Sequence, residues 1–419
     1  MRAAIIVLLL SVSAVGAEPE FVIETVPATT YVRTRTKLSV KATSPLPEEA
    51  RISWQAEGGT LLFDDLTDVE WKTPRQPGAY PVNVQIAIGD QTHDVRTLID
   101  VKSPSTDGMI WIPPGEFIQG DRAGTHDTDQ IKTFQNSADE PYRPVRVGGY
   151  WIDRDPVTHG QYRVFLQEAL KQGFIDAESV AVFGEFEGSW VPFYYFKSYE
   201  ELAATYLKTV TSRQPHFLHW ISWNPTTRTF VVEEGKEDFP VVDVSWFGAV
   251  AYARFYGKHL PTEAQWEKSA RGTDGRKFPW GDHFPTVFHG NLNYELGSGP
   301  LRVGEFSPHS DSPYGVRDML GPLFEWTTDW FNGPYYSDRQ SQRPDRDPLG
   351  TFWGPAHAIR GFPYALNYPG ILSEGTDPIS FRYAWHFEFF MGDIFANRQT
   401  TFRTSISPVK DHPRYGDPF

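Results

Sequence analysis

The sequence contains no cysteine among its 419 residues, and this absence excludes several ways of stabilising a fold. Without thiols the chain forms no disulfide bonds and no thiolate metal sites, and it carries no lipid on a cysteine. Its stability must therefore come from buried apolar cores. Hydrophobic residues make up 40% of the chain and aromatic residues 15%, which is enough core material for two or three domains at this length.

The first seventeen residues, 1–17, have the pattern of a secretory signal peptide. Met1 and Arg2 supply the charged start, an apolar run follows over 3–10, and small residues lead to Ala17. The apolar run is shorter than a bilayer requires, so we expect cleavage here and no stable membrane span afterwards. The predicted location of the mature protein is periplasmic or secreted.

The balance of charge argues against a nucleic-acid partner. The formal net charge is −14 at pH 7. Binding to DNA or RNA depends on clustered lysine and arginine side chains that neutralise phosphates. We therefore exclude nucleic acid and interpret the acidity as a solvated surface.

Residues 18–102 show the alternation expected of short β-strands, most clearly over 52–56 and 80–88. Turn-forming pairs interrupt the pattern at strand-length intervals, which predicts a small all-β sandwich; the pairs are Gly58–Gly59, Pro77–Gly78 and Gly89–Asp90. This region resembles bacterial immunoglobulin-like or PKD-like modules, and we interpret it as a spacer or docking domain. Residues 103–108 are polar and contain proline and glycine, as a linker does.

Residues 109–419 are densely punctuated by glycine and proline, and only two segments predict helices. One runs over 158–172 with apolar residues at helical spacing, and Gly173 follows it. The other begins at Thr262, where Gln265 completes a capping box, and ends at Arg271. The pattern indicates an irregular, loop-rich α+β domain, and the aromatic-rich segment 176–238 is interpreted as an insertion.

A series of motifs in this domain is more specific. They occur in the order Met109–Phe117, Asp139–Pro141, Asp155–Tyr162, Pro240–Trp246, Gly257–Gly272, Pro279–Asp282, Asp318–Gly321, Glu325–Thr327, Arg360–Gly361 and Phe402–Arg403. In composition and order they resemble the formylglycine-generating enzyme, or sulfatase-modifying factor, family. The resemblance covers about three quarters of the chain and implies a C-type-lectin-like fold. We expect the tryptophans of these motifs to anchor its core; they are Trp246, Trp266, Trp280, Trp326 and Trp330.

The resemblance also implies chemistry that this chain does not retain. In the family, formylglycine formation depends on a cysteine pair that binds copper, and thiolates are the soft ligands that Cu(I) prefers. Since the sequence has no cysteine, we predict that it is not a cysteine-dependent formylglycine-generating oxidase.

Calcium is the second feature that the resemblance implies. The family's usual Gly-Asn before the Glu-Trp motif is Gly321–Pro322 here, which leaves Glu325 as a candidate ligand. Asn291, after Gly290, is a candidate ligand for a second calcium site. Calcium requires about six oxygen ligands, so neither site is complete from the sequence alone.

A late aromatic strand suggests another metal chemistry. If 381–389 is a strand, alternation places Arg382, His386 and Glu388 on one face. A histidine and a carboxylate on one face are part of the two-His-one-carboxylate set that holds iron. A third ligand is required, and His309, His357 and His412 are all candidates; His216 and His219 form a similar pair at helical spacing.

Two functional hypotheses follow. The first is an exported binding or scaffold protein of the cell envelope, whose partner is a protein, peptide or glycan held in an aromatic-lined groove. The second is a divergent oxidase or oxygenase that uses iron or copper on His386 and Glu388, with Arg382 beside them as a third catalytic residue. A structural histidine–glutamate pair is the simpler interpretation of the same residues.

Overall fold

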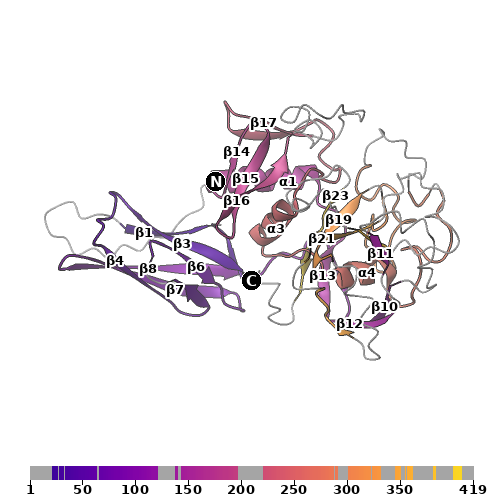
Figure 1. Cartoon of the computed structure of the whole chain (residues 1–419), viewed down its shortest axis with the longest axis horizontal. Helices are drawn as coiled ribbons and strands as arrows, with labels where there is room; N and C mark the ends of the chain where they lie inside the picture. The colour runs from indigo at the N-terminus through magenta and orange to yellow at the C-terminus, as the bar shows by residue number, and fades with distance from the viewer. Residues whose placement is uncertain are drawn as a thin grey trace. The chain divides into compact units, whose positions relative to one another are not determined.

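The protein forms two compact units in a computed structural model (Figure 1). The first unit comprises Met1–Ser105 with Phe255–Gly257, and the second comprises Thr106–Arg254 and Lys258–Phe419. The structure describes residues 21–26, 28–32, 34–63, 66–120, 137–139, 143–196, 220–286, 288–290, 301–321, 323–331, 345–350, 354, 356–361, 381–383 and 400–407. The predicted signal peptide lies outside these residues.

The first unit is the predicted all-β sandwich. One sheet has the order β1-β3-β6-β5 and the other β2-β8-β7-β4. Their bounds are β1 Phe21–Val26, β2 Thr30–Tyr31, β3 Arg35–Ala42, β4 Arg51–Ala56, β5 Thr60–Leu62, β6 Asp68–Lys72, β7 Gly78–Ile88 and β8 Gln91–Lys102. The hairpin of β7 and β8 pairs over its whole length, from Gly78 opposite Val101 to Ile88 opposite Gln91.

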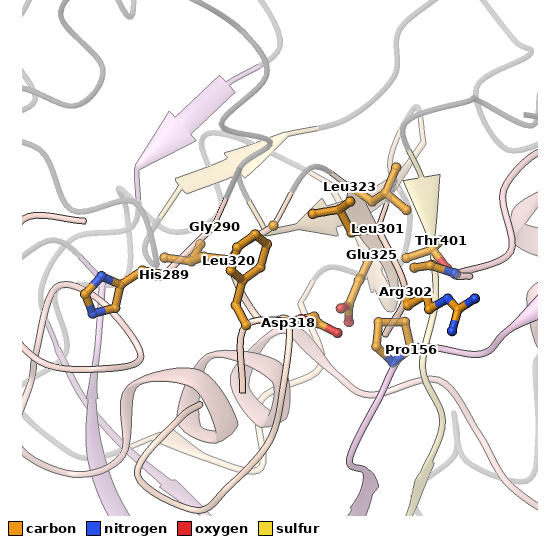
Figure 2. Close-up of a pocket in the computed structure, with 13 residues that line it drawn as sticks. Pro156, His289, Gly290, Leu301, Arg302, Asp318, Leu320, Leu323, Glu325 and Thr401 are labelled. Atoms are coloured by element: carbon orange, nitrogen blue, oxygen red, sulfur yellow. The ribbon is translucent and has the colours of Figure 1, made fainter. Parts of the chain in front are cut away.

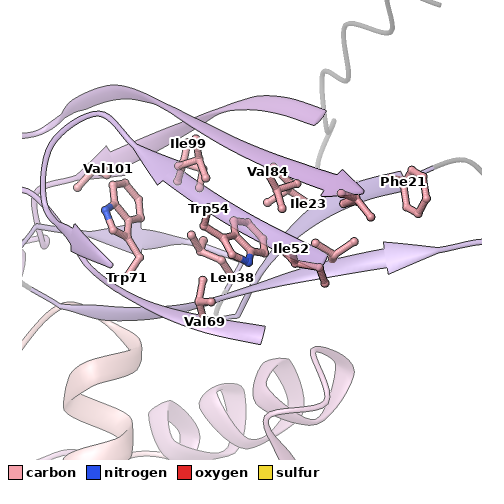
Figure 3. Packing of buried hydrophobic residues seen from close by; sticks show 13 residues of the cluster. Phe21, Ile23, Leu38, Ile52, Trp54, Val69, Trp71, Val84, Ile99 and Val101 are labelled. Atoms are coloured by element: carbon pink, nitrogen blue, oxygen red, sulfur yellow. The ribbon is translucent and has the colours of Figure 1, made fainter. Parts of the chain in front are cut away.

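Two tryptophans fill the centre of this sandwich (Figure 3). Trp54 and Trp71 are buried, and each indole donates its one hydrogen bond to a loop carbonyl. The Trp71 donation reaches Gly58, which precedes Gly59 in a left-handed turn with φ of 79° and 69°. A Cβ atom on Gly59 would lie 2.3 Å from the Lys72 carbonyl oxygen, so this predicted turn requires glycine.

The second unit is mixed and rich in loops, which confirms the predicted fold class. Its sheets are small, and their orders are β24-β13-β9, β10-β12-β20, β11-β22-β21-β19-β23, β14-β15-β16 and β17-β18. The bounds are β9 Met109–Ile112, β10 Gly115–Gln119, β11 Ser137–Asp139, β12 Arg143–Val147, β13 Tyr150–Asp153, β14 Ile175–Ala177, β15 Ala181–Phe186, β16 Ser189–Tyr195, β17 Ile221–Asn224, β18 Thr229–Val232, β19 Phe324–Trp330, β20 Asp345–Arg346, β21 His357–Arg360, β22 Phe381–Tyr383, β23 Thr400–Thr401 and β24 Ser405–Ile406.

Both predicted helices are present. The helix α1 runs over His159–Lys171 and α4 over Glu263–Arg271, and each begins with the capping box that its sequence encodes. Thr158 and Thr262 accept from the backbone three residues on, while Gln161 and Gln265 reach back to the caps. None of the helices in the described residues is long and apolar enough to cross a membrane.

A third helix, α3 at Trp246–Phe255, was not among the predicted helices. It carries apolar residues around most of its circumference, so it lacks the one-sided pattern on which that prediction depends. Ser245 caps it, because the Ser245 Oγ accepts from the Gly248 backbone N–H at 3.0 Å. Gly248 itself packs so tightly that a Cβ atom there would lie 2.1 Å from the Phe193 carbonyl oxygen.

The motif tryptophans divide into two groups. Trp246, Trp266 and Trp326 are buried as expected, whereas Trp280 and Trp330 are half-buried. The segment interpreted as an insertion contains the three-stranded sheet β14-β15-β16 and the hairpin β17-β18. Its status as an insertion stays a prediction.

Buried charges surround α4. Arg360 on β21 pairs with Glu263 and Glu267, and Arg271 pairs with Glu267 one helical turn away. Glu267 also accepts from the Gly120 backbone N–H at 2.8 Å. A charged helix is therefore fully buried because its carboxylates and guanidinium groups pair with one another.

Candidate functional site

A pocket opens where six separate stretches of the second unit meet (Figure 2). The cavity itself has a volume of about 40 Å³, and the hollow reaches about 490 Å³ when the open solvent at its mouth is included. Most of its wall is apolar, and Asp318, Glu325, Arg302, His289 and Thr401 bring polar groups to it. The other lining residues are Pro156, Pro240, Gly290, Leu301, Phe306, Leu320, Gly321 and Leu323. Apolar walls with a few convergent polar groups are typical of a ligand site.

Glu325 lies near the N-terminal end of β19 and forms a bidentate ion pair with Arg403. Arg403 Nη2 donates to Oε1 at 2.6 Å and Nε donates to Oε2 at 2.6 Å. The Trp266 indole, on α4, also donates to Oε2 at 2.9 Å. Both ionic side chains are buried, and every Glu325 oxygen already accepts a hydrogen bond from a protein donor.

The remaining donors of Arg403 are also used. Nη1 donates to the carbonyls of Asp153 and Arg154, both at 3.1 Å, and Nη2 donates to the carbonyl of Arg317 at 2.9 Å. Burial lowers the pKa of Arg403, but the carboxylates of Glu325, Asp318 and Asp155 together more than offset this, and the net pKa is raised. The guanidinium therefore stays charged in the interior.

Asp318 is a carboxyl group of the pocket whose pKa is raised. It adopts the left-handed region with φ of 54°, and its Oδ2 accepts from the Gly304 N–H at 2.6 Å. Burial raises the pKa of Asp318 to about 6; the Gly304 bond and Arg403 lower it, while Asp155 and Glu325 raise it. The carboxyl is thus ready to exchange a proton in mildly acidic solution.

Thr401 supplies a second unusual polar group. The residue is 1% exposed, lies on β23 and lines the pocket. Its Oγ1 is buried and makes no hydrogen bond in the part of the chain that the structure describes. An unpaired buried hydroxyl costs free energy, which makes Thr401 a candidate hydrogen-bonding group for a ligand.

Comparison with known proteins now identifies the family. The model of the sulfatase-modifying factor enzyme 1-like domain matches residues 96–383, which begin within β8. The chain belongs to this family. A formylglycine-generating enzyme of Streptomyces coelicolor is 29% identical over 276 residues, covering 62% of this chain and 79% of the relative. An inactive Cα-formylglycine-generating enzyme 2 of Bos taurus is 32% identical over 247 residues, covering 55% of this chain and 73% of the relative.

Glu325, the first candidate calcium ligand, lies in the pocket wall. The structure brings it together with Asp318, a carboxylate that the sequence analysis had placed in a motif without assigning it a role. In the described part of the chain no group of three or more His, Asp or Glu side chains could hold a metal ion. Because both Glu325 oxygens already accept from donors, calcium here would have to share them. Asn291 lies outside the described residues, and calcium binding stays a prediction at both places.

Most residues of the hypothetical iron or copper site are outside the residues that the structure describes. His386, Glu388 and His412 are outside the described residues, as are His216 and His219. Arg382 lies on β22, where its backbone is opposite Ala138, and its side chain is not described. The oxidase hypothesis therefore stays untested at its central residues.

Two of the candidate third ligands are described. His357 is buried on β21 between two tryptophans, with ring centroids 3.6 Å from Trp246 and 3.8 Å from Trp330. His309 lies 5.8 Å, between ring centroids, from Phe288, whose side chain is 64% exposed. The stacking gives His357 an aromatic packing role in the core of this family domain.

Removing one partner of the Arg403–Glu325 pair tests how much this ion pair contributes to the free energy of unfolding. We expect Glu325→Gln to lower the free energy of unfolding by about 3–5 kcal/mol, because it leaves the buried guanidinium without its counter-charge. Urea denaturation measures the change. Lys171→Ala breaks an exposed pair with Glu168 and serves as the control, with an expected effect within about 0.5 kcal/mol. A loss below about 1 kcal/mol for Glu325→Gln would contradict the assignment.

The raised pKa of Asp318 predicts a pH dependence. Its folded pKa of about 6 exceeds the ordinary aspartate pKa of 3.8, so the folded state holds the proton more tightly. Relative to Asp318→Asn, the wild type should be most stable below about pH 4 and should lose about 2–3 kcal/mol as the pH rises through 6. Denaturation of both proteins from pH 4 to 7.5 measures this difference. Parallel profiles would show that Asp318 has an ordinary pKa.

Proposed function

We propose that this chain is an exported binding protein, in which a sulfatase-modifying factor domain holds a ligand without oxidising a thiol. One observation carries the proposal: the full sequence contains no cysteine, although the core of the domain keeps its buried ion pairs, Arg403 with Glu325 and Arg360 with Glu267. The copper chemistry of formylglycine formation requires thiolates on the enzyme. The scaffold therefore remains while the reactive groups are missing.

Two relatives support a role other than catalysis. The proteins named inactive Cα-formylglycine-generating enzyme 2 in Bos taurus and Mus musculus are 32% and 30% identical to this chain over the matched residues. A domain of this family thus occurs in proteins named for lacking the activity. One fold can host different functions, so membership of the family does not by itself require the oxidase activity.

The pocket around Asp318 and Thr401 is the proposed place of binding. It combines apolar walls with a proton-exchanging carboxyl and an unpaired hydroxyl. These groups suit a peptide or a glycan, because both present hydroxyl or amide hydrogen-bonding groups on an apolar frame. The proposed setting is the periplasm or the extracellular space, as the predicted signal peptide suggests.

The catalytic alternative has a direct test. Purified protein, supplied with copper and oxygen, should convert no detectable cysteine to formylglycine in a sulfatase-derived peptide, as measured by mass spectrometry. The Streptomyces coelicolor relative is the positive control. Conversion above the level of a protein-free reaction would overturn the proposal.

Thr401→Val offers a test of the pocket that spares the fold. Valine has nearly the shape of threonine and leaves no unpaired hydroxyl, so the free energy of unfolding should be unchanged or higher. Capture of a partner or glycan from envelope extract by immobilised protein should fall at least about tenfold, as expected for one lost buried hydrogen bond. Quantitative mass spectrometry measures the recovered material.

Thr36→Val is the matched control, because the Thr36 hydroxyl is also buried and makes no hydrogen bond within the described residues, but it belongs to the sandwich. It should capture as much as the wild type. Equal capture by all three proteins would rule out the pocket as the binding site, and capture by none would rule out the binding function.

A further inference from the structure

Two aromatic rings of the second unit form a corner that holds an ammonium group. Trp220 and Phe239 meet edge to face, with ring centroids 4.9 Å apart and an angle of 74° between their planes. The Lys236 Nζ lies 4.5 Å from the Trp220 centroid and 4.7 Å from the Phe239 centroid. Both distances are within the range of a cation–π interaction.

The walls of this corner are fixed by contacts that do not involve the Lys236 side chain. The Phe239 carbonyl oxygen accepts from the backbone N–H of His159 at 2.9 Å, and the His159 Nδ1 lies 3.0 Å from the same oxygen. The His159 ring packs on Trp220 with centroids 5.1 Å apart. Trp220 also packs against Val242 and Leu323 in a buried cluster. The corner therefore keeps its shape if the lysine leaves.

Lys236 reaches the corner from a short exposed turn. The Lys236 N–H donates to the Glu233 carbonyl at 3.0 Å, and the Glu233 N–H donates to the Trp220 carbonyl at 2.8 Å. The turn carries four exposed carboxylates within six residues, which attract cations from solution; they are Glu233, Glu234, Glu237 and Asp238.

The corner also borders the pocket. Leu323 packs against Trp220 and lines the pocket, and Arg302 lines the pocket while its guanidinium lies 6.0 Å from the Phe239 centroid. Pro240, the residue after Phe239, is itself in the pocket wall. The aromatic corner and the pocket therefore share Leu323 and Arg302 as neighbours.

We propose that the corner of Trp220 and Phe239 is a binding site for a quaternary ammonium group, which Lys236 covers in the free protein. This inference deepens the proposed binding function and rests on it. A primary ammonium is strongly hydrated and loses water when it packs on aromatic rings. A trimethylated ammonium has no N–H groups to satisfy and presents methyl groups to the ring faces. It is therefore the better occupant of the same corner.

Calorimetric titration with choline chloride tests the site, with sodium chloride at equal ionic strength as the blank. We expect wild-type protein to bind choline with a Kd of about 1–10 mM. Lys236→Ala removes the competing cation and should tighten binding about three- to thirtyfold. Lys236→Arg keeps a competing cation and should bind as weakly as the wild type. Phe239→Leu removes one ring while preserving apolar volume and should abolish binding, and circular dichroism checks its fold.

Lys171→Ala is the control for loss of a lysine elsewhere and should match the wild type. Absence of choline binding to folded Lys236→Ala would overturn the proposal, and so would equal affinity of Lys236→Ala and wild type. A second arm uses phosphatidylcholine vesicles: sedimentation of Lys236→Ala with them identifies a lipid headgroup as a source, and binding of free choline alone identifies a soluble one. If the protein captures a partner but does not bind choline, this inference is wrong and the proposed binding function is still supported.

Discussion

Arg403 is the point at which separate parts of the second unit are tied together. Its five N–H groups reach Glu325 on β19, the carbonyls at the end of β13, and the Arg317 carbonyl in the loop beside the pocket. Through Glu325 the same connection extends to Trp266 on α4. A buried charge is tolerable only when its hydrogen bonds are complete, and here all five donors are used. Lysine has three donors and no planar fork, so it could not replace this arginine.

A cysteine-free chain with this many loops depends on such ionic connections. The sheets of the second unit are short, and they supply few ladder hydrogen bonds to hold the loops between them. Buried guanidinium groups fix loop carbonyls at defined positions, which apolar packing cannot do because it has no direction. The Arg360 pairs with Glu263 and Glu267 serve α4 in the same way. This explains why the domain retains a defined pocket without disulfide bonds.

Local signals in the sequence predicted local structure well. The capping box at Thr262 predicted the start of α4, the apolar spacing over 158–172 predicted α1, and the turn-forming pairs of the sandwich predicted its turns. The helix α3 was missed because it is apolar on most sides, although Ser245 was a usable capping signal. Strand pairing that joins residues far apart, such as β19 with β23, leaves no periodic trace in either segment.

The site was harder to predict for the same reason. Glu325 was recognised as a candidate ligand, but its buried partner Arg403 is 78 residues away and had been noted only as part of a terminal motif. Asp318 has a raised pKa because burial and the carboxylates of Asp155 and Glu325 act together, and these two carboxylates come from different places in the sequence. Such coupling depends on distances in space, which spacing along the chain does not determine.

The aromatic corner illustrates how a binding surface can persist independently of catalytic groups. Hydrogen bonds to its carbonyl hold the Phe239 backbone at the start of α1, and the ring packs on Trp220. The adjoining Pro240 lines the pocket. The backbone N–H of the next residue, Val241, donates a hydrogen bond to the Val157 carbonyl at 2.8 Å. The walls of both features are thus consequences of how the chain pairs with the start of one helix. Loss of reactive side chains elsewhere in the domain would leave these walls in place, and selection could then act on what they bind.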